Sequence, residues 1–205
     1  MKKLLLSTAA LALFVSPVAA QDSYDYEALS PLSGFYAGGF AGYGWNDADT
    51  NLGFDADVDG GDYGIFVGYQ ADAILDETIN RIGLGLNGAI EVHYAWSDAD
   101  DNVAGVEVEK DSEWGISFRP GFSILSEAMP LGLNPYGIIG YRRAEFEADG
   151  IGDEDFDGFE LGIGTELVGY GDYGVRLDYT HVWYEEKNGI EPDANELRLG
   201  VAYHF

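Results

Sequence analysis

The sequence predicts an all-β fold, an eight-stranded antiparallel up-and-down transmembrane β-barrel. Apolar residues recur at every second position in eight separate segments, and successive side chains of a strand point to opposite faces. One face of these segments carries large apolar and aromatic residues, whereas the other is small or polar. Beyond the N-terminus, no stretch approaches the roughly 18 consecutive apolar residues of a transmembrane helix.

The N-terminal 20 residues have the pattern of a cleavable signal peptide. Lys2 and Lys3 precede an apolar run from Leu4 to Val15, and Val18-Ala19-Ala20 supplies small residues for cleavage. The alternative, a membrane-anchoring helix, would be too short to span comfortably. We therefore expect a signal peptide over 1–20, a polar leader over 21–33 and one outer-membrane barrel domain over 34–205.

The strand-like segments follow one another at regular spacing. They run from Gly34 to Trp45, Gly61 to Ala71, Ile82 to Trp96, Ser112 to Phe122, Pro135 to Phe146, Asp157 to Leu167, Tyr173 to Tyr184 and Asn195 to Phe205. The third is the clearest, because one face is apolar except for Gly88, and its length of roughly 50 Å suits a tilted strand that extends beyond a bilayer. The fifth has mixed faces, so the pattern leaves its orientation open. The last ends in two outward aromatics, Tyr203 and Phe205.

The predicted connections alternate in character. Those after the first, third, fifth and seventh strands are acidic, namely Asn46 to Gly60, Ser97 to Asp111, Glu147 to Phe156 and Glu185 to Asn195. Consecutive connections of an antiparallel barrel lie at opposite ends, so every second connection lies at the same end. The sequence therefore predicts that the acidic loops gather at one end of the barrel.

Composition excludes several classes of protein. The net charge is −27, and no basic patch appears, so we expect no nucleic-acid partner. The hydrophobic content of 46% is too high for an acidic disordered chain. The chain has no cysteine, which excludes disulfides, thiolate metal sites and cysteine nucleophiles.

The two faces of the strands predict which side meets lipid. If the bulky set pointed inward, the outside would be mostly glycine, so we place the bulky set against lipid. The interior of eight strands has room only for side chains, and isolated ions there would be costly. We therefore expect a lumen plugged by a network of paired charges, made of Glu91, Arg119, Glu160, Glu166, Arg176, Asp178 and Arg198.

Four stretches resemble a known family. G-F-Y-A-G-G-F-A-G-Y-G-W, Y-G-I-F-V-G-Y, R-L-D-Y and the terminal L-R-L-G-V-A-Y-H-F are similar to the outer-membrane β-barrel family. This family includes OmpA-like transmembrane domains and small porin-family surface proteins of Gram-negative bacteria, and the resemblance covers 34–205. It implies the cell outer membrane as location and the barrel-assembly machinery as a partner that reads an assembly signal at Tyr203 and Phe205. We also expect outer-membrane lipid and periplasmic chaperones as partners.

The remaining motifs predict neither a cofactor nor a dedicated metal site. Aspartates over 46–51 and 98–102 could bind divalent cations weakly, but the pattern of an EF-hand is absent. Ser117, His93 and Glu91 could meet on neighbouring strands, although lumen filling explains them equally well. We expect a non-enzymatic structural or surface-interaction protein. The alternatives are a narrow porin for small solutes or ions and, less favoured, a lipid-modifying barrel enzyme.

Overall fold

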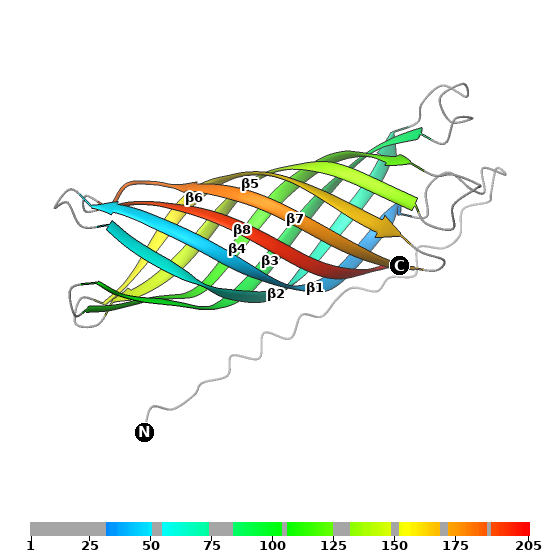
Figure 1. The fold of residues 1–205 in the computed structure, drawn as a ribbon. Coiled ribbons are helices and arrows are strands. Elements are labelled where there is room, and N and C mark those ends of the chain that lie inside the picture. Colours follow the sequence, from blue (N-terminus) through cyan, green and yellow to red (C-terminus); the bar gives the residue numbers. More distant parts are fainter. Residues whose placement is uncertain are drawn as a thin grey trace.

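The computed structural model describes residues 32–50, 55–73, 84–103, 106–124, 132–148, 152–168, 172–187 and 190–205. They form eight strands: β1 (Gly34–Thr50), β2 (Asp55–Ala73), β3 (Leu84–Val103), β4 (Val106–Ile124), β5 (Gly132–Ala148), β6 (Gly152–Val168), β7 (Tyr173–Tyr184) and β8 (Ile190–His204). Each strand pairs antiparallel with its neighbours in sequence, and β8 pairs with β1 (Figure 1). The predicted eight-stranded up-and-down barrel is confirmed.

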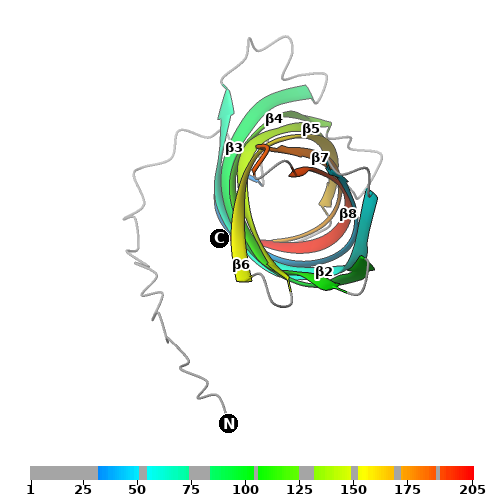
Figure 2. The same ribbon diagram turned by 90° about the vertical axis from the view of Figure 1, so that its left-hand side faces the viewer.

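Closure between the first and last strands removes both sheet edges. The β1–β8 ladder runs from Tyr36 opposite His204 to Thr50 opposite Ile190. Beyond it, the Phe205 amide donates to the Phe35 carbonyl at 2.9 Å. The strands therefore form a complete ring when seen along the barrel (Figure 2), and every strand has two partners. This arrangement satisfies the backbone hydrogen bonds of a chain that crosses lipid.

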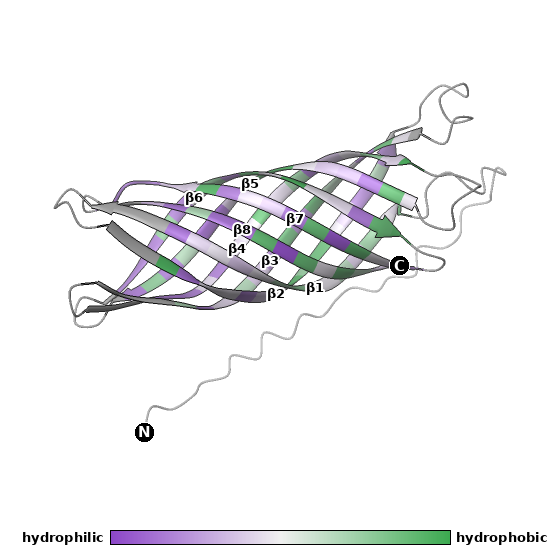
Figure 3. Cartoon of the chain, viewed as in Figure 1, coloured by the Kyte–Doolittle hydropathy of each residue, from purple (hydrophilic) through white to green (hydrophobic). Residues whose placement is uncertain are grey.

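Hydrophobic and hydrophilic residues alternate along the strands (Figure 3), and the bulky apolar set faces outward. Ile163, for example, is 68% exposed although it lies in the middle of the sheet. Two aromatic belts border this outer surface. One, at the end that holds Gly34 and Phe205 (the terminal end), contains Phe35, Tyr69, Phe122, Tyr173, Tyr203 and Phe205. The other, at the opposite end (the rim end), contains Tyr43, Trp45, Tyr63, Trp96, Trp114, Tyr141, Phe159 and Trp183.

The distance between the belts suits a membrane. On β1 the interval runs from Phe35 to Trp45, and on β7 it runs from Tyr173 to Trp183. Both intervals match the roughly 9–11 residues that a tilted strand needs to cross the hydrocarbon layer. None of the described residues forms a helix long and apolar enough to cross a membrane.

The acidic segments do lie at one end of the barrel, the rim end, but the expectation that they are connections is wrong for most of their residues. Most of those residues continue the strands, so that β1 extends to Thr50, β2 begins at Asp55 and β3 is joined to β4 by only two residues between Val103 and Val106. The low strand propensity of aspartate is outweighed here, because the neighbouring strand continues the hydrogen-bonded ladder. We call these extensions the acidic rim, and they comprise 46–50, 55–60, 97–103, 106–111, 144–148, 152–157 and 190–195.

A β-bulge changes the alternation of β4 where the acidic rim begins. The register with β5 shifts between Lys110 and Ser112, and as a result Lys110, Ser112 and Glu113 are all buried. An extra residue of this kind re-aims the side chains that precede it. Strict alternation counted back from Arg119 places Glu113 inward but Lys110 outward, so it misses the burial of Lys110.

The structure also resolves the orientation of the fifth strand. Ile138 and Arg142 are completely buried, whereas Ile139 and Tyr141 are exposed. The even-numbered residues of β5 therefore point inward, including Arg142.

Of the N-terminal assignments, the signal peptide over 1–20 and most of the leader over 21–33 lie outside the described residues.

Glycine makes room for large lumenal side chains. A Cβ on Gly38 would overlap the ring of Phe66 and the carbonyl oxygen of Val201. The neighbouring Gly39 faces outward, and a Cβ there would lie 3.4 Å from the carbonyl oxygen of Gly64, which is ordinary contact. The requirement for glycine is therefore confined to the inward position.

This difference predicts opposite outcomes for two adjacent substitutions. Gly38→Ala should lower the free energy of unfolding by about 1–3 kcal/mol, the usual cost of overpacking, whereas Gly39→Ala should leave it nearly unchanged. Urea titration of the refolded barrel, followed by tryptophan fluorescence, measures both. Equal stability of the two variants would contradict the lumenal packing.

Candidate functional site

The lumen holds two layers of buried charged residues, each supplied by several strands. Arg142 of β5 is at the centre of the layer nearer the rim end, the rim layer. Its guanidinium lies 3.1 Å from Glu113 Oε1 and 2.5 Å from Glu160 Oε1, and it also pairs with Glu196. It also donates to Thr180 Oγ1 at 3.0 Å. One arginine thereby joins carboxylates from β4, β6 and β8 across the interior.

Two further cations complete the rim layer. Lys110 Nζ lies 2.9 Å from Glu113 and 3.0 Å from Glu196, while the nearest oxygen of Asp62 is 3.6 Å away. Arg198 lies 2.7 Å from Glu196 and also pairs with Glu113. The layer thus contains Lys110, Arg142 and Arg198 against the four carboxylates of Asp62, Glu113, Glu160 and Glu196.

The second layer, the terminal layer, is a closed square of two arginines and two acids. Arg176 binds Glu91 through both carboxylate oxygens, at 2.6 and 2.9 Å, and Asp178 at 2.9 Å. Arg119 lies 2.7 Å from Glu91 and 2.9 Å from Asp178. Each arginine therefore contacts both acids, and the charges balance.

Tyrosine hydroxyls and aromatic rings hold these layers in place. Tyr36 donates to Glu91 at 3.0 Å, and Tyr136 donates to Asp178 at 2.6 Å. The guanidinium carbon of Arg176 lies 3.9 Å from the centre of the Phe66 ring, and that of Arg198 lies 4.5 Å from the centre of the Phe40 ring. Such stacking favours the cation and adds to the ion pairs.

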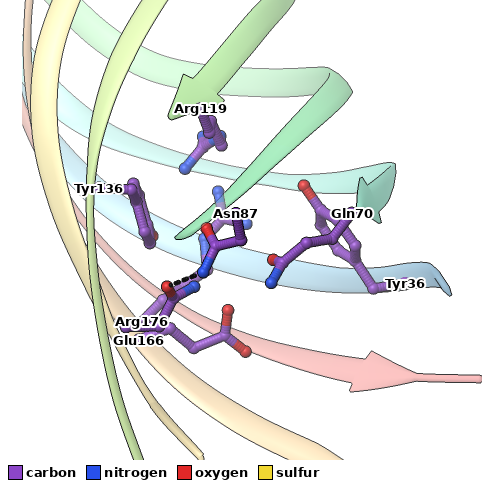
Figure 4. Close-up of a pocket in the computed structure, with 8 residues that line it drawn as sticks. Tyr36, Gln70, Asn87, Arg119, Tyr136, Glu166 and Arg176 are labelled. Carbon is purple, nitrogen blue, oxygen red and sulfur yellow. Dashed lines mark hydrogen bonds between the residues drawn. The ribbon is translucent and has the colours of Figure 1, made fainter. Parts of the chain in front are cut away.

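A small polar cavity lies on the terminal-end side of these layers. Its volume is about 10 Å³, close to the space that one water molecule needs. Figure 4 shows its lining, which consists of Tyr36, Gln70, Asn87, Arg119, Asn134, Tyr136, Glu166 and Arg176. Asn87 donates to Asn134 at 2.8 Å, the dashed line in the figure. The cavity is therefore bounded by arginines of the terminal layer.

Glu166 lines this cavity and makes a separate pair near the end of the barrel. It reaches across β7 to His204 of β8, whose Nε2 lies 2.8 Å from Glu166 Oε1. Gly174 lies on the intervening strand, where a Cβ would overlap the carboxyl group of Glu166. The pair thus depends on the absence of a side chain at that position.

All seven residues expected in the lumen are buried there. Six of them, all except Glu166, belong to the two layers, and Glu166 pairs with His204 instead. The expectation omitted Asp62, Lys110, Glu113, Arg142 and Glu196. Alternation alone could have found Asp62, Glu113 and Glu196, since they share faces with Gln70, Arg119 and Arg198 respectively. By contrast, no signal in the sequence locates the bulge that turns Lys110 inward. Nor does the sequence show which face of β5 points into the lumen, because both faces carry an arginine.

The lumen does not form the arrangement that a serine hydrolase needs. Glu91 is opposite Ser117 in the β3–β4 register, but it belongs to the terminal layer. The Ser117 hydroxyl accepts from Arg119 at 3.4 Å, and His93 Nε2 lies 3.5 Å from Glu113 Oε1 rather than against Ser117. A nucleophile must lie within hydrogen-bonding reach of its base, so these residues are filling rather than an assembled dyad.

The aspartate-rich stretches form no metal centre that the described residues reveal. No group of three or more histidine and carboxylate side chains is suitably placed in that part of the chain. Asn46, which begins the first stretch, is buried and donates to the Val58 carbonyl at 2.5 Å. Asn51 lies outside the described residues.

Comparisons with known proteins agree with the barrel architecture. A family model described as "Outer membrane protein beta-barrel domain" matches residues 7–205. The 25 kDa outer-membrane immunogenic protein of Brucella ovis is 26% identical over 220 residues, covering 100% of this chain and 98% of that protein. The protein of the same name from Brucella abortus is 26% identical over 228 residues, covering 100% and 99%.

One solved structure shares the fold over most of its length. Neisserial surface protein A superimposes with a TM-score of 0.52 at 18% identity, covering 84% of this chain and 98% of that one. At this level of identity the likeness concerns the fold alone.

The two neighbouring arginines of β5 allow a matched test of the rim layer. Arg142→Gln leaves buried carboxylates without their central partner and should lower the free energy of unfolding by about 3–5 kcal/mol. Arg143 faces outward and pairs with Asp155 at 2.5 Å, so Arg143→Gln should have a much smaller effect. Urea unfolding in detergent micelles measures the difference, and similar losses for both variants would refute the central role of Arg142.

Proposed function

This chain belongs to the outer membrane protein beta-barrel domain family, and we propose that it is a non-enzymatic surface protein whose lumen is closed to solutes. It is an integral protein of the cell outer membrane. The observation that carries the proposal is the pair of charged layers, in which ion pairs at 2.6–3.0 Å link strands that are not neighbours in the sheet: β4 with β8, β4 with β7, and β3 with β7. A permeating solute would have to separate these buried pairs, which is costly in a low-dielectric interior.

Surface exposure of the acidic rim forms the second part of the proposal. The relatives that match this chain over its full length are named outer-membrane immunogenic proteins, which supports an exposed segment. The rim contains exposed carboxylates such as Glu147 and Asp153 on paired strands. We infer that the rim end faces the outside of the cell, where these groups remain hydrated.

A narrow porin is the competing function, and conductance separates the two. In planar bilayers, the refolded barrel should give no steady openings, because both layers block the passage. Heat-modifiable mobility on gels and flotation with liposomes confirm that the sample is folded and inserted. Steady single-channel currents from such a sample would overturn the closed-lumen proposal.

The terminal strand is proposed to carry the assembly signal. Phe205 is 73% exposed, and its ring packs edge-on against Tyr203 with centroids 5.0 Å apart. The side chain thus contributes little to the interior and is available to the barrel-assembly machinery.

Deletion of Phe205 should consequently lower the yield of folded protein in the outer membrane, whereas Phe205→Tyr should preserve it. The yield is measured in cells as the heat-modifiable fraction of the membrane-inserted protein. Refolding of the purified deletion variant in detergent is the control, because it separates assembly from stability. A normal yield in cells would refute the signal.

A further inference from the structure

The rim layer has one acid more than it has bases. Lys110 is shared among three carboxylates, at 2.9 Å from Glu113, 3.0 Å from Glu196 and 3.6 Å from Asp62. Asp62 is served least, because neither of its carboxylate oxygens has a hydrogen-bond partner in the described part of the chain. The side chain is nevertheless buried, and a buried charge is costly unless it is paired and hydrogen-bonded.

Another buried oxygen without a partner comes from the neighbouring strand. Asn46 of β1 donates through Nδ2 to the Val58 carbonyl at 2.5 Å, and this leaves its Oδ1 unpartnered among the residues that the structure describes. Together with the carboxylate of Asp62, this makes three shielded acceptors that lack a donor. Such a set of oxygens suits a hard cation, which binds through oxygen ligands.

Gly44 leaves space between these two side chains. A Cβ at this inward position of β1 would lie 3.4 Å from Asp62 Oδ2, 3.6 Å from Asn46 Nδ2 and 3.6 Å from Glu196 Cγ, all ordinary contacts. By contrast, a Cβ on Gly42, the preceding inward position, would come within 2.7 Å of a backbone carbonyl oxygen of β8. The lumen is therefore open over Gly44 by the size of one small group, and Asp62 and Asn46 border this opening.

We propose that the space over Gly44 binds one sodium ion, held by the carboxylate of Asp62 and by Oδ1 of Asn46. The single charge of sodium balances the excess acid of the rim layer, whereas calcium would overcompensate it and takes roughly six to eight oxygen ligands. The small opening favours sodium over the larger potassium ion. His93 does not replace the ion, because its Nε2 lies 3.5 Å from Glu113 Oε1 and the ring forms no ion pair with Asp62 in the described structure.

The sodium site concerns the rim layer itself. It depends neither on a lumen that is closed to solutes nor on which end of the barrel faces outside the cell. Failure of the site would therefore leave the proposed function standing, and steady channel currents would leave the site standing.

Urea unfolding at constant ionic strength tests for the ion. The refolded mature chain is kept in micelles of an uncharged detergent, while choline chloride is replaced stepwise by sodium chloride. One ion that binds only the folded state should lower the unfolding constant about tenfold for each tenfold rise in sodium above its dissociation constant. Potassium should give a smaller response. No dependence on sodium, or an equal response to potassium, would overturn the assignment.

Substitutions locate this response at the site. Asp62→Asn removes the excess charge at constant size, so this variant should keep its stability in choline chloride and lose the dependence on sodium. Asp59→Asn is the matched control, because Asp59 is exposed on the same strand and its loss changes the net charge equally. Equal destabilisation of Asp62→Asn with and without sodium would show that Lys110 alone neutralises Asp62, and would overturn the site.

Gly44→Ala tests the space without changing any charge. Its methyl group makes only ordinary contacts, so the variant should fold normally, occupy the position of the ion and lose the dependence on sodium. A wild-type response to sodium in this variant would overturn the site.

Sodium NMR gives a readout that does not depend on stability. At equal protein concentration, the wild type should broaden the sodium resonance more than Asp62→Asn does, and Asp59→Asn should match the wild type. Equal broadening by the wild type and Asp62→Asn would indicate an adventitious ion only, attracted by the acidic surface, and would overturn the proposal.

Discussion

Neutralisation of charge inside a closed barrel is the constraint on which this structure depends. Eight strands leave a lumen only wide enough for side chains, so each ion in it must find its partner among the other lumenal residues. Arg142 meets this requirement from β5 by contacting acids of three other strands, and Arg176 does so from β7. The contacts of Arg142 with Glu196 of β8 and of Arg176 with Glu91 of β3 join strands that are not neighbours in the sheet, and they therefore fix the cross-section of the barrel.

The packing of glycine follows from the same constraint. A long charged side chain and the ring that stacks on it need space above the neighbouring strands, and an inward glycine provides that space. Phe66, which supports Arg176, occupies the position that a Cβ of Gly38 would take. A few large ionic groups fill the inside of the barrel, so the other inward residues must be small. The outside has no such limit and carries many bulky apolar residues.

Strict alternation was sufficient to predict the barrel, its lipid-facing surface and the lumenal position of residues such as Glu91 and Arg198. It failed where local geometry departs from a period of two. The bulge after Lys110 adds one residue, and the fifth strand carries arginines on both faces, so only the ladders show that Arg142 is the inward one. The acidic segments were expected to be connections, but pairing with an already formed neighbour outweighs the low strand preference of aspartate there. Which acid pairs with which base in each layer depends on distances across the lumen, and the spacing of residues along the sequence does not determine these distances.

The distribution of charge links the lumen to the acidic rim. Among the residues whose side chains the structure describes, the buried charged groups comprise five bases and seven acids, so these lumenal groups carry little of the net charge of −27. Within the rim, Glu145 is opposite Asp155 and Glu147 is opposite Asp153, although like charges directly opposite destabilise a ladder. Charge pairing therefore does not hold these rim strands together; inward apolar contacts such as that of Phe146 with Phe156, whose ring centroids lie 5.6 Å apart, do so in part. Their pairing continues a ladder that is fixed below them, in the band where the lumenal ion pairs join the strands, so the bases buried in the lumen also support the acidic surface above it.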